Sequence, residues 1–470
     1  MSIEGLDTLA AAIGADRIER DEAKLDARRH DYWALSHVRD FVGSPAPRPG
    51  ALVRPRSVAE VRAVLAFANE RRVAVIPFGL GSGVVGGVVA SPGAILLDLG
   101  AMDAVRFIDP VNLLAGFDAG RNGLAAEEAV AARGLTIGHW PQSVAVSSVG
   151  GWVATRASGQ LSTGYGAIED IVHSIEAVLP NGDVVTLGKG PRASAGPDLR
   201  HLMLGSEGTL GVITGVTFSL RRAPEAKAVS CFEAPTMRAG FELQREIVQR
   251  GWRPPVMRQY DERESRRQHA DAEACLIMIA HEGPAALVEA ERAAVAATAA
   301  EAGIAAAPGE IVERWFGHRN QVPSWDTLLA RGLVVDTVEV SGNWTEIGDI
   351  YDEAVASLKS IEGLIAGSAH SSHVYRSGLN LYFTFAVQTS APDQMERAYL
   401  EGWRRIMEAT ARHGGSIAHH HGIGRVRRDW LATELGETGV ALLRRVKAAL
   451  DPNGIMNPHV LLPGVLLPDA

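Results

Sequence analysis

Hydrophobic residues recur at two different spacings in the first half of the chain. Residues 57–60 have the form of a capping box, and hydrophobic residues then return at helical spacing, which predicts a helix. Short β-branched runs follow at residues 73–76 and 94–99, each bounded by Pro, Gly or Asp, and these runs predict strands. The pattern predicts one α+β domain over residues 49–222, preceded by a helical segment at residues 1–48.

The pattern differs in the second half of the chain. Residues 285–302 are rich in Ala and Glu with helical spacing, whereas residues 381–386 alternate as a strand does. We therefore expect an α/β cap over residues 223–410 that covers the first domain. Residues 411–470 hold a histidine motif and an amphipathic helix at residues 440–450, and we expect this C-terminal segment to pack back on the first domain.

The composition limits the classes of function. The chain has 470 residues, of which 46% are hydrophobic and 21% charged, with a net charge of −9 and no long basic run. A nucleic-acid partner is therefore not expected. No apolar stretch reaches the roughly 18 residues that cross a bilayer, and the N-terminus lacks a signal-peptide pattern. We expect a cytoplasmic protein without a transmembrane segment, and buried free thiols at Cys231 and Cys275, which lie in apolar runs.

A glycine-rich loop follows the strand predicted at residues 73–76. The loop comprises Pro77, Phe78, Gly79, Leu80, Gly81, Ser82 and Gly83. Residues 81–86 match the dinucleotide fingerprint G-x-G-x-x-G, but that motif requires a helix that starts within it. Residues 88–93 are β-branched and then broken by Pro and Gly, so no helix is expected there. Glycines still allow successive backbone N–H groups to converge on phosphate oxygens, and the loop is either such an anion site or an ordinary turn.

Two later segments are rich in small and hydroxyl residues and poor in charge, namely residues 140–159 and residues 205–214. A backbone of this composition can approach a large flat cofactor closely and hydrogen-bond to its ring edge. These segments indicate a cofactor site that extends beyond the glycine loop.

With these segments the chain resembles the FAD-binding PCMH-type flavoproteins of the vanillyl-alcohol oxidase superfamily. The motifs are Gly-Trp-Val-Ala-Thr-Arg-Ala-Ser-Gly at residues 151–159, Gly-Ser-Glu-Gly-Thr-Leu-Gly-Val-Ile-Thr at residues 205–214 and a triple histidine at residues 419–421. Within that superfamily the chain is most similar to the alkylglycerone-phosphate synthase family and its bacterial relatives. The resemblance extends over about residues 20–465.

The resemblance implies that FAD is the cofactor and that the glycine loop holds its pyrophosphate. It also implies that residues 142–148 and 155–158 follow the flavin ring and ribityl chain, and that residues 207–213 meet the adenosine half. The further cofactor-binding candidates are Pro141, Gln142, Ser143, Ser147, Ser148, Gly151, Thr155, Arg156, Ala157, Ser158, Glu207, Gly208, Gly211, Val212 and Ile213. Some members of the superfamily carry a histidine, linked covalently to FAD, where this chain has Ser82. We therefore expect non-covalent FAD, and we also expect a homodimer.

Three adjacent histidines, His419, His420 and His421, form the most distinctive polar cluster. On an extended segment their side chains alternate, so that His419 and His421 share one face. Imidazole titrates near neutral pH, which suits general acid/base catalysis or the binding of a substrate anion. A surface polyhistidine is one alternative. A metal site needs a further ligand, and because no partner spacing is visible, no metal is expected. The resemblance implies that the triple histidine lines the active site.

Two tyrosines are candidate functional residues. Tyr382 alternates with Phe383 along the predicted strand, and from the residues alone it is either a core aromatic or a functional hydroxyl. The resemblance implies that Tyr382 acts as a general acid/base. Tyr375 is a second candidate, which we expect to contact the substrate.

Arg258 is the candidate for holding an anionic substrate. It lies after an apolar run and matches an arginine near the flavin and the substrate in the resembled family. A planar guanidinium can hold a carboxylate or a phosphate through two parallel hydrogen bonds. The alternative is a structural ion pair with Asp261 or Glu262.

Two departures from the synthase pattern concern the substrate. Relatives of the synthase carry Arg-Asp where this chain has Trp325-Asp326, and Trp-Asp-Arg where it has Trp344-Thr345-Glu346. Positive charges near the substrate opening are therefore absent or inverted here, which weakens the case for a phosphorylated substrate.

We expect an FAD-dependent oxidoreductase that transfers a hydride from a hydroxyl-bearing carbon to flavin N5. The substrate is a 2-hydroxy acid or a related alcohol. Tyr382 or one of the three histidines takes the hydroxyl proton, and Arg258 holds the anionic end. Two alternatives stay open: a transferase like the synthase, in which FAD forms a substrate adduct without net redox, and an FAD-binding subunit that acts only within a larger complex.

Overall fold

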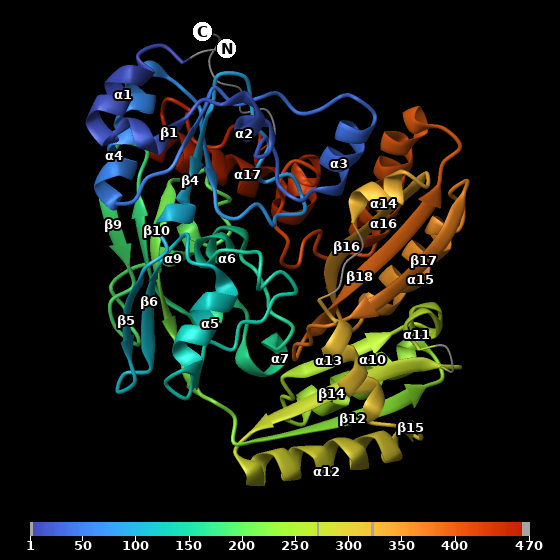
Figure 1. The fold of residues 1–470 in the computed structure, drawn as a ribbon. Helices are drawn as coiled ribbons and strands as arrows, with labels where there is room; N and C mark the ends of the chain where they lie inside the picture. Colours follow the sequence, from blue (N-terminus) through green and yellow to red (C-terminus); the bar gives the residue numbers. More distant parts are fainter. Residues whose placement is uncertain (1–2, 270–271, 321–323, 463–470) are drawn as a thin grey trace.

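The computed structural model describes residues 3–269, 272–320 and 324–462. Figure 1 shows two halves side by side, with the residues before about 222 on the left and most later residues on the right. The C-terminal helix, drawn in red, returns to the left half. The fold is a mixture of helices and sheets, as the sequence predicted.

A small sheet begins the N-terminal half. Its strand order is β1 (Ile18–Glu19), β2 (Ala51–Val53), β4 (Ile95–Asp98) and β3 (Val75–Phe78). Strands β2, β4 and β3 are parallel, and α4 (Val58–Arg71) packs its buried face on them. The Ser57 hydroxyl caps α4 by accepting the N–H of Glu60 at 3.2 Å, as the capping-box pattern predicted.

The N-terminal segment is not entirely helical. It contains α1 (Leu6–Ile13), α2 (Glu22–Asp26) and α3 (Ala34–Phe41), but also the strand β1. Ile18 and Glu19 pair with Val53 and Leu52, so residues 1–48 contribute an edge strand to the first sheet. Two residues are too few to carry the alternation that would identify a strand in the sequence.

The glycine loop begins where β3 ends at Phe78. All of residues 79–94 are described, and none of them is helical. The loop therefore differs from a Rossmann motif, as the sequence predicted, because no helix N-terminus lies behind it.

A five-stranded antiparallel sheet completes the N-terminal half. Its strand order is β5 (Val105–Asp109), β6 (Leu114–Asp118), β10 (Val212–Ser219), β8 (Val172–Val178) and β9 (Val184–Leu187). The short pair β7 (Leu135–Thr136) and β11 (Arg221–Arg222) lies apart from it. The helices of this region are α5 (Gly123–Ala131), α6 (Val149–Thr155), α7 (Ser162–Tyr165), α8 (Ile168–Ile171) and α9 (Arg200–Met203).

The cap is built on a seven-stranded sheet in which neighbouring strands run antiparallel. Its strand order is β15 (Ala305–Ala307), β12 (Ala226–Ala234), β14 (Cys275–Gly283), β13 (Val256–Tyr260), β17 (Leu364–Ser371), β18 (Gly378–Gln388) and β16 (Leu333–Asn343). The accompanying helices are α10 (Met237–Gln249), α11 (Glu262–Gln268), α12 (Ala285–Glu301), α13 (Glu310–His318), α14 (Trp325–Leu329), α15 (Ile347–Leu358) and α16 (Met395–Arg412). Cys231 and Cys275 are buried free thiols in this sheet, as predicted.

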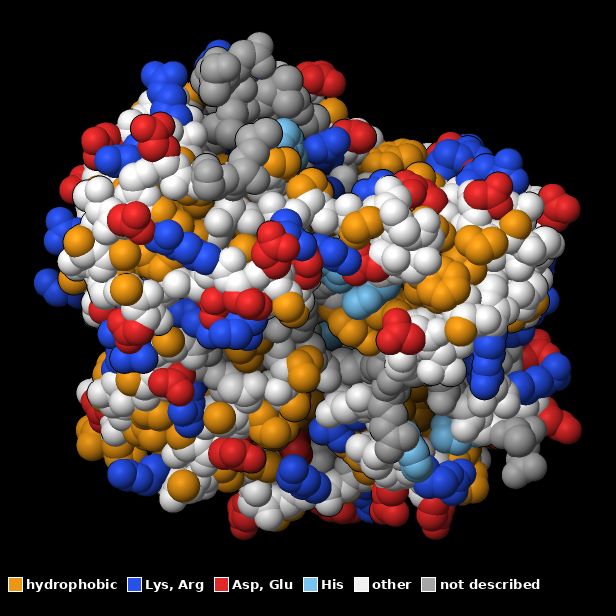
Figure 2. All heavy atoms as spheres, turned by 45° about the horizontal axis from the view of Figure 1, so that its top comes forward, with side chains coloured by type: hydrophobic (Ala, Val, Ile, Leu, Met, Phe, Trp, Pro, Cys, Tyr) orange, Lys and Arg blue, Asp and Glu red, His pale blue; other side chains and the backbone are white. Residues whose placement is uncertain are grey.

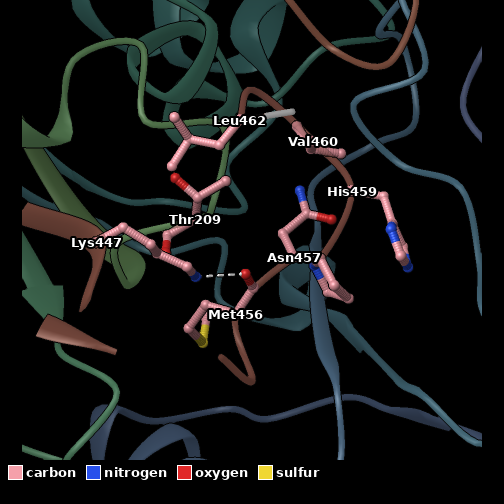
Figure 3. Close-up of a pocket in the computed structure, with 8 residues that line it drawn as sticks. Thr209, Lys447, Met456, Asn457, His459, Val460 and Leu462 are labelled. Carbon is pink, nitrogen blue, oxygen red and sulfur yellow. Dashed lines mark hydrogen bonds between the residues drawn. The ribbon is translucent and has the colours of Figure 1, made fainter. Parts of the chain in front are cut away.

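The C-terminal segment returns to the first sheet. Helix α17 (Leu431–Leu450) is longer than the helix expected at residues 440–450 and kinks at Gly436, which has non-helical angles. The buried Lys447 ammonium donates to the carbonyl of Thr209 at 2.7 Å. It also donates to the carbonyl of Met456 at 2.8 Å, the hydrogen bond that is dashed in Figure 3. These residues line a cavity of about 10 Å³, which is about the volume that one water molecule needs. Within the described part of the chain no helix is long and apolar enough to cross a membrane.

Candidate active site

Three of the predicted cofactor segments meet in the N-terminal half. A Cβ atom added to Gly79 would lie 2.3 Å from the Ser148 hydroxyl, and one added to Gly208 would lie 2.9 Å from the ring of Pro77. Gly208 has a φ of +73°, a backbone conformation that glycine adopts without strain. Glycine therefore allows the loop after β3, the start of α6 and the turn before β10 to touch. We call these segments, residues 77–83, 147–158 and 205–208, the cofactor cradle.

The cofactor cradle fits a bound dinucleotide. Among the described residues, the backbone N–H groups of residues 79–83 donate to no protein acceptor, which leaves them free for phosphate oxygens. Val146, beside the cradle, is 59% exposed, although valine side chains are usually buried. Ser148 caps α6 by accepting the N–H of Gly151 at 3.2 Å. Free amides and an exposed apolar side chain suit the pyrophosphate and the flat ring of FAD.

Some predicted cofactor residues have other contacts in the structure. The side chains of Val212 and Ile213 are buried in the hydrophobic cores on either side of β10 and do not face the cradle. Arg156 ends α6 and forms an ion pair with Glu169 at 3.2 Å. Gln142 is exposed. The remaining candidates divide into buried residues, which are Pro141, Ser147, Ala157, Ser158 and Gly211, and half-buried ones, which are Ser143, Gly151 and Thr155.

Glu207 joins the cofactor cradle to the C-terminal segment. Its carboxylate accepts the N–H groups of Ile423 and Gly424, each at 2.8 Å, directly after the triple histidine. Burial raises the pKa of Glu207 to about 7 against the opposing effect of these two hydrogen bonds. Asp31, which the sequence did not single out, is a second buried carboxyl nearby, and burial likewise raises its pKa to about 7. The side chain expected to contact the cofactor is thus bound to the segment that carries the histidines.

Tyr382 lies on β18 among histidines from three parts of the chain. Its hydroxyl is 2.7 Å from Nε2 of His420 and 3.3 Å from Nε2 of His373. The ring of His370, on β17, stacks on the Tyr382 ring with centroids 4.6 Å apart. The neighbouring Phe383 is fully buried on the opposite face of the strand, as the alternation predicted. Tyr382 is therefore a half-buried phenol with two imidazole partners, and desolvation by the surrounding side chains raises its pKa above the ordinary value.

The triple histidine does not alternate between two faces. The chain bends at residues 419–421 instead of running as a strand. The ring centroids of His419 and His420 are 4.9 Å apart, and those of His420 and His421 are 4.4 Å apart. The prediction that His419 and His421 share a face opposite His420 was wrong, because it assumed an extended backbone. Figure 2 shows histidine side chains at the surface along the seam between the two halves.

Tyr375 joins the same group of side chains. Its hydroxyl lies 2.7 Å from Nε2 of His419, and Nδ1 of His419 lies 2.7 Å from Nδ1 of His420. Serine hydroxyls of the N-terminal half reach across to the cap: Ser162 is 2.6 Å and Ser158 is 3.3 Å from Nδ1 of His373. We call the hydrogen-bonded side chains His373, Tyr375, Tyr382, His419 and His420 the histidine–tyrosine cluster.

A buried ion pair holds the backbone that carries two histidines next to this cluster. Glu339, on β16, and Arg427 are both fully buried and form a salt bridge with each other. The Glu339 carboxylate also accepts the backbone N–H groups of His420 at 3.1 Å and His421 at 2.6 Å. Although burial opposes ionisation, the charge of Arg427 holds the pKa of Glu339 below its ordinary value. The carboxylate therefore holds the bent histidine segment in place.

Burial keeps the imidazoles of the cluster neutral. It lowers the pKa of His419 to about 4 and the pKa values of His373 and His420 well below the ordinary value. Neutral imidazole carries one donor and one acceptor nitrogen, so each ring can pass a proton between two partners.

Arg258, on β13, lies beside the cluster without a carboxylate partner among the described residues. Its guanidinium donates to the Ser372 hydroxyl and lies over the rings of Tyr260 and Trp315, at 5.0 Å and 5.4 Å from their centroids. The alternative of an ion pair with Asp261 or Glu262 is not what the structure shows, since Asp261 caps α11 and Glu262 pairs with Arg266. An arginine held by aromatic rings remains available to a ligand anion.

The cluster also contains candidate metal ligands. Nitrogens of His373, His419 and His420 lie within 4.8 Å of one another, and Glu339, His420 and His421 form a second such group. A third ligand is therefore present in space, although no spacing in the sequence indicated it. The nitrogens of His419 and His420, however, are engaged with each other and with the two tyrosine hydroxyls at 2.7 Å. This arrangement is that of a hydrogen-bonded network.

Besides Asp31, the sequence analysis did not identify four residues of the site. His370 and His373 lie five and two residues before Tyr375, and a histidine pair so close to a candidate tyrosine was a usable signal. Glu339 interrupts the apolar alternation of β16, which signals a buried charge that needs a partner. Its partner Arg427 carried no such local signal.

Comparisons with known proteins agree with this geometry. Residues 49–188 match the model of an FAD binding domain, and residues 223–461 match the model of the FAD linked oxidases, C-terminal domain. The uncharacterized FAD-linked oxidoreductase YgcU of Escherichia coli K12 is 34% identical over 97% of this chain and 98% of that protein. The alkyldihydroxyacetonephosphate synthase of Dictyostelium discoideum is 29% identical over 91% of this chain and 76% of the synthase.

Solved structures show the same architecture. A structure of an alkyldihydroxyacetonephosphate synthase superposes with a TM-score of 0.80 at 25% identity, covering 97% of this chain and 85% of the other. A structure of p-cresol methylhydroxylase superposes with a TM-score of 0.76 at 18% identity, which shows the shared fold alone. The two matched models and the 34% identity over nearly the whole length show that the chain belongs to the family of FAD-linked oxidases and is an FAD-linked oxidoreductase.

Proposed function

We propose that this oxidoreductase oxidises a hydroxyl-bearing carbon of a small anionic substrate, a 2-hydroxy acid or a related alcohol. When bound, FAD supplies the acceptor for the hydride that leaves this carbon. The protein contributes binding of the anion, orientation of the carbon and removal of the hydroxyl proton.

The observation that carries the proposal is the position of Arg258 relative to Tyr382. The guanidinium donates to the hydroxyl of Ser372, the residue directly before His373, and His373 is a hydrogen-bond partner of Tyr382 at 3.3 Å. The guanidinium has no carboxylate partner among the described residues. A carboxylate bound by Arg258 leaves the adjacent hydroxyl group of a 2-hydroxy acid near Tyr382. The Tyr382 hydroxyl, held 2.7 Å from Nε2 of His420, is then the acceptor for the substrate proton.

FAD is proposed to bind non-covalently. Ser82 stands in the loop where a covalently linked histidine occurs in some flavoproteins, and serine offers no comparable attachment chemistry. Acid precipitation of the holoprotein should therefore release the yellow flavin into the supernatant. Flavin that stays with the pellet would contradict this proposal.

A transferase is the second candidate, favoured by the likeness to two synthases in sequence and structure. Against it, Trp325 stands where the synthase relatives have an arginine, and its ring packs against His37 of α3, with ring centroids 5.9 Å apart. Glu346 stands at the other arginine position and brings a negative charge. Neither side chain would help to hold a phosphate.

Anaerobic mixing separates the two candidates. The holoprotein is mixed with a panel of D- and L-2-hydroxy acids, and separately with acyl-dihydroxyacetone phosphate and a fatty alcohol. Oxidation predicts bleaching of the flavin absorbance by a hydroxy acid and no ether product. An ether product without bleaching would replace the proposal by the transferase, and no reaction in either mixture without an added protein partner would indicate a subunit of a larger complex.

A further inference from the structure

We propose that Tyr382, His420, His419 and Tyr375 form a proton wire, which carries the hydroxyl proton of the substrate to a pocket beside Tyr375. The wire rests on the proposed function, because only a reaction that breaks an O–H bond needs such a path. It adds an exit route and assigns Tyr375 a role in proton transfer.

The wire consists of three consecutive hydrogen bonds of 2.7 Å. The first joins the Tyr382 hydroxyl to Nε2 of His420, and the second joins Nδ1 of His420 to Nδ1 of His419. The third joins Nε2 of His419 to the Tyr375 hydroxyl. Each imidazole thus uses both of its nitrogens, one toward each neighbour.

The donors and acceptors alternate consistently along the wire. Tyr382 donates to His420, Nδ1–H of His420 donates to His419, and Nε2–H of His419 donates to Tyr375. Every group is then neutral and every acceptor has one donor. Burial favours this state, since it lowers the pKa of His419 to about 4 and that of His420 well below the ordinary value.

The wire ends at a tyrosine that is partly open to solvent. Tyr375 is 38% exposed and lines a pocket of about 320 Å³ together with Ser416 and Glu434. The other branch from Tyr382 leads through His373, at the longer distance of 3.3 Å, to Ser162. Ser162 is buried, at 5% exposure. The path through Tyr375 is therefore the one that connects the site to solvent.

Proton transfer along the wire conserves charge at every residue. The substrate O–H bond breaks and its proton passes to the Tyr382 oxygen, and bound FAD would accept the hydride of the carbon that carries this oxygen. Tyr382 gives its own proton to His420, His420 gives one to His419, and His419 gives one to Tyr375. Tyr375 releases its proton to water in the pocket. One proton enters and one leaves, and no residue keeps a charge.

The first test needs no substrate. In the FAD-loaded protein labelled with ¹⁵N-histidine, NMR should show one protonated and one unprotonated nitrogen in each ring of His419 and His420 at about pH 7. Tyr375→Phe should alter both rings, because the wire loses its terminal acceptor. Two protonated nitrogens in either ring at this pH, or bound zinc in stoichiometric amount by elemental analysis, would overturn the wire even if the substrate class were correct.

The second test measures proton transfer directly. Stopped-flow reduction of the flavin by the best hydroxy acid should slow about tenfold to a hundredfold in Tyr375→Phe, with a larger solvent isotope effect. Added imidazole, which can enter the pocket, should restore part of the rate. Tyr351→Phe is the matched control, because its hydroxyl is 3.4 Å from Asp261 and lies outside the wire.

The outcomes of the two tests are distinguishable. A Tyr375→Phe protein that changes only KM and does not respond to imidazole would show a substrate contact and overturn the wire. If no hydroxy acid reduces the wild-type flavin, the proposed function fails, and the NMR pattern alone decides whether the hydrogen-bonded path exists.

Discussion

The cofactor cradle and the histidine–tyrosine cluster meet where Ser158 lies 3.3 Å from His373, but they are built in opposite ways. The cradle uses backbone amides and small residues, and glycine at Gly79 and Gly208 lets its segments touch. The cluster uses the side chains of histidines and tyrosines that come from β18 and from two bent segments of the chain. The cradle can therefore bind a common cofactor with little chemistry of its own, whereas the reaction depends on a few side chains.

The largest effect is expected in the cluster. Tyr382→Phe should slow reduction of the flavin by a hydroxy acid about a thousandfold, because it removes the acceptor of the substrate proton. FAD content, measured from the visible absorbance, should not change, since the cradle is untouched. Tyr351→Phe should reduce at the wild-type rate, and equal rates in all three proteins would remove Tyr382 from the mechanism.

The second-largest effect is expected at the buried ion pair between Glu339 and Arg427. Glu339→Gln leaves Arg427 buried without its partner and should lower the free energy of unfolding by about 3 kcal/mol, measured by urea denaturation. The matched change is Glu353→Gln, at a surface pair with His413. It should lower the free energy of unfolding by about 0.5 kcal/mol. Similar losses in both variants would show that the buried pair does not specially stabilise the cluster.

A change in the cradle should impair binding rather than chemistry. Gly208→Ala places a Cβ against the Pro77 ring in a strained backbone conformation, and should weaken FAD binding about tenfold to a hundredfold. Titration of the apoprotein with FAD measures this loss. Gly182→Ala is the control, because Gly182 has a similar φ of +87° but no neighbour within 4 Å of the added atom. If Gly208→Ala binds FAD normally but reacts slowly, the division between cradle and cluster is wrong.

The smallest effect is expected in how the free energy of unfolding depends on pH. Burial lowers the pKa of His419 from 6.5 to about 4, so the unfolded chain binds more protons than the folded one between these values. The stability that the neutral His419 side chain contributes is complete above pH 6.5 and is lost as the pH falls. From about pH 7.5 to 5.5, His419 should account for a loss of about 1 kcal/mol in the free energy of unfolding. His419→Gln should reduce this pH dependence, and His201→Gln, at an exposed site, should leave it unchanged.

Local motifs in the sequence identified segments that meet in the structure. The loop at residues 77–83 and the segments around Ser148 and Gly208 were each identified from composition, and they meet in the structure. The prediction of alternating histidines at residues 419–421 was wrong because it assumed a straight backbone. The bend depends on Glu339, which lies about 80 residues earlier and accepts the N–H of His421 at 2.6 Å.

The sequence by itself determined the α+β fold and the loop without a Rossmann helix, because these depend on patterns within short stretches of chain, and its family motifs implied the use of FAD. Only the tertiary structure decided that His373 and Tyr375 join Tyr382 and His420, that Glu207 binds the segment after the histidines, and that Arg258 lacks a carboxylate partner among the described residues. The physical reason is that hydrogen bonds and ion pairs join residues far apart in the chain, and their distances depend on how the sheets and bent segments pack.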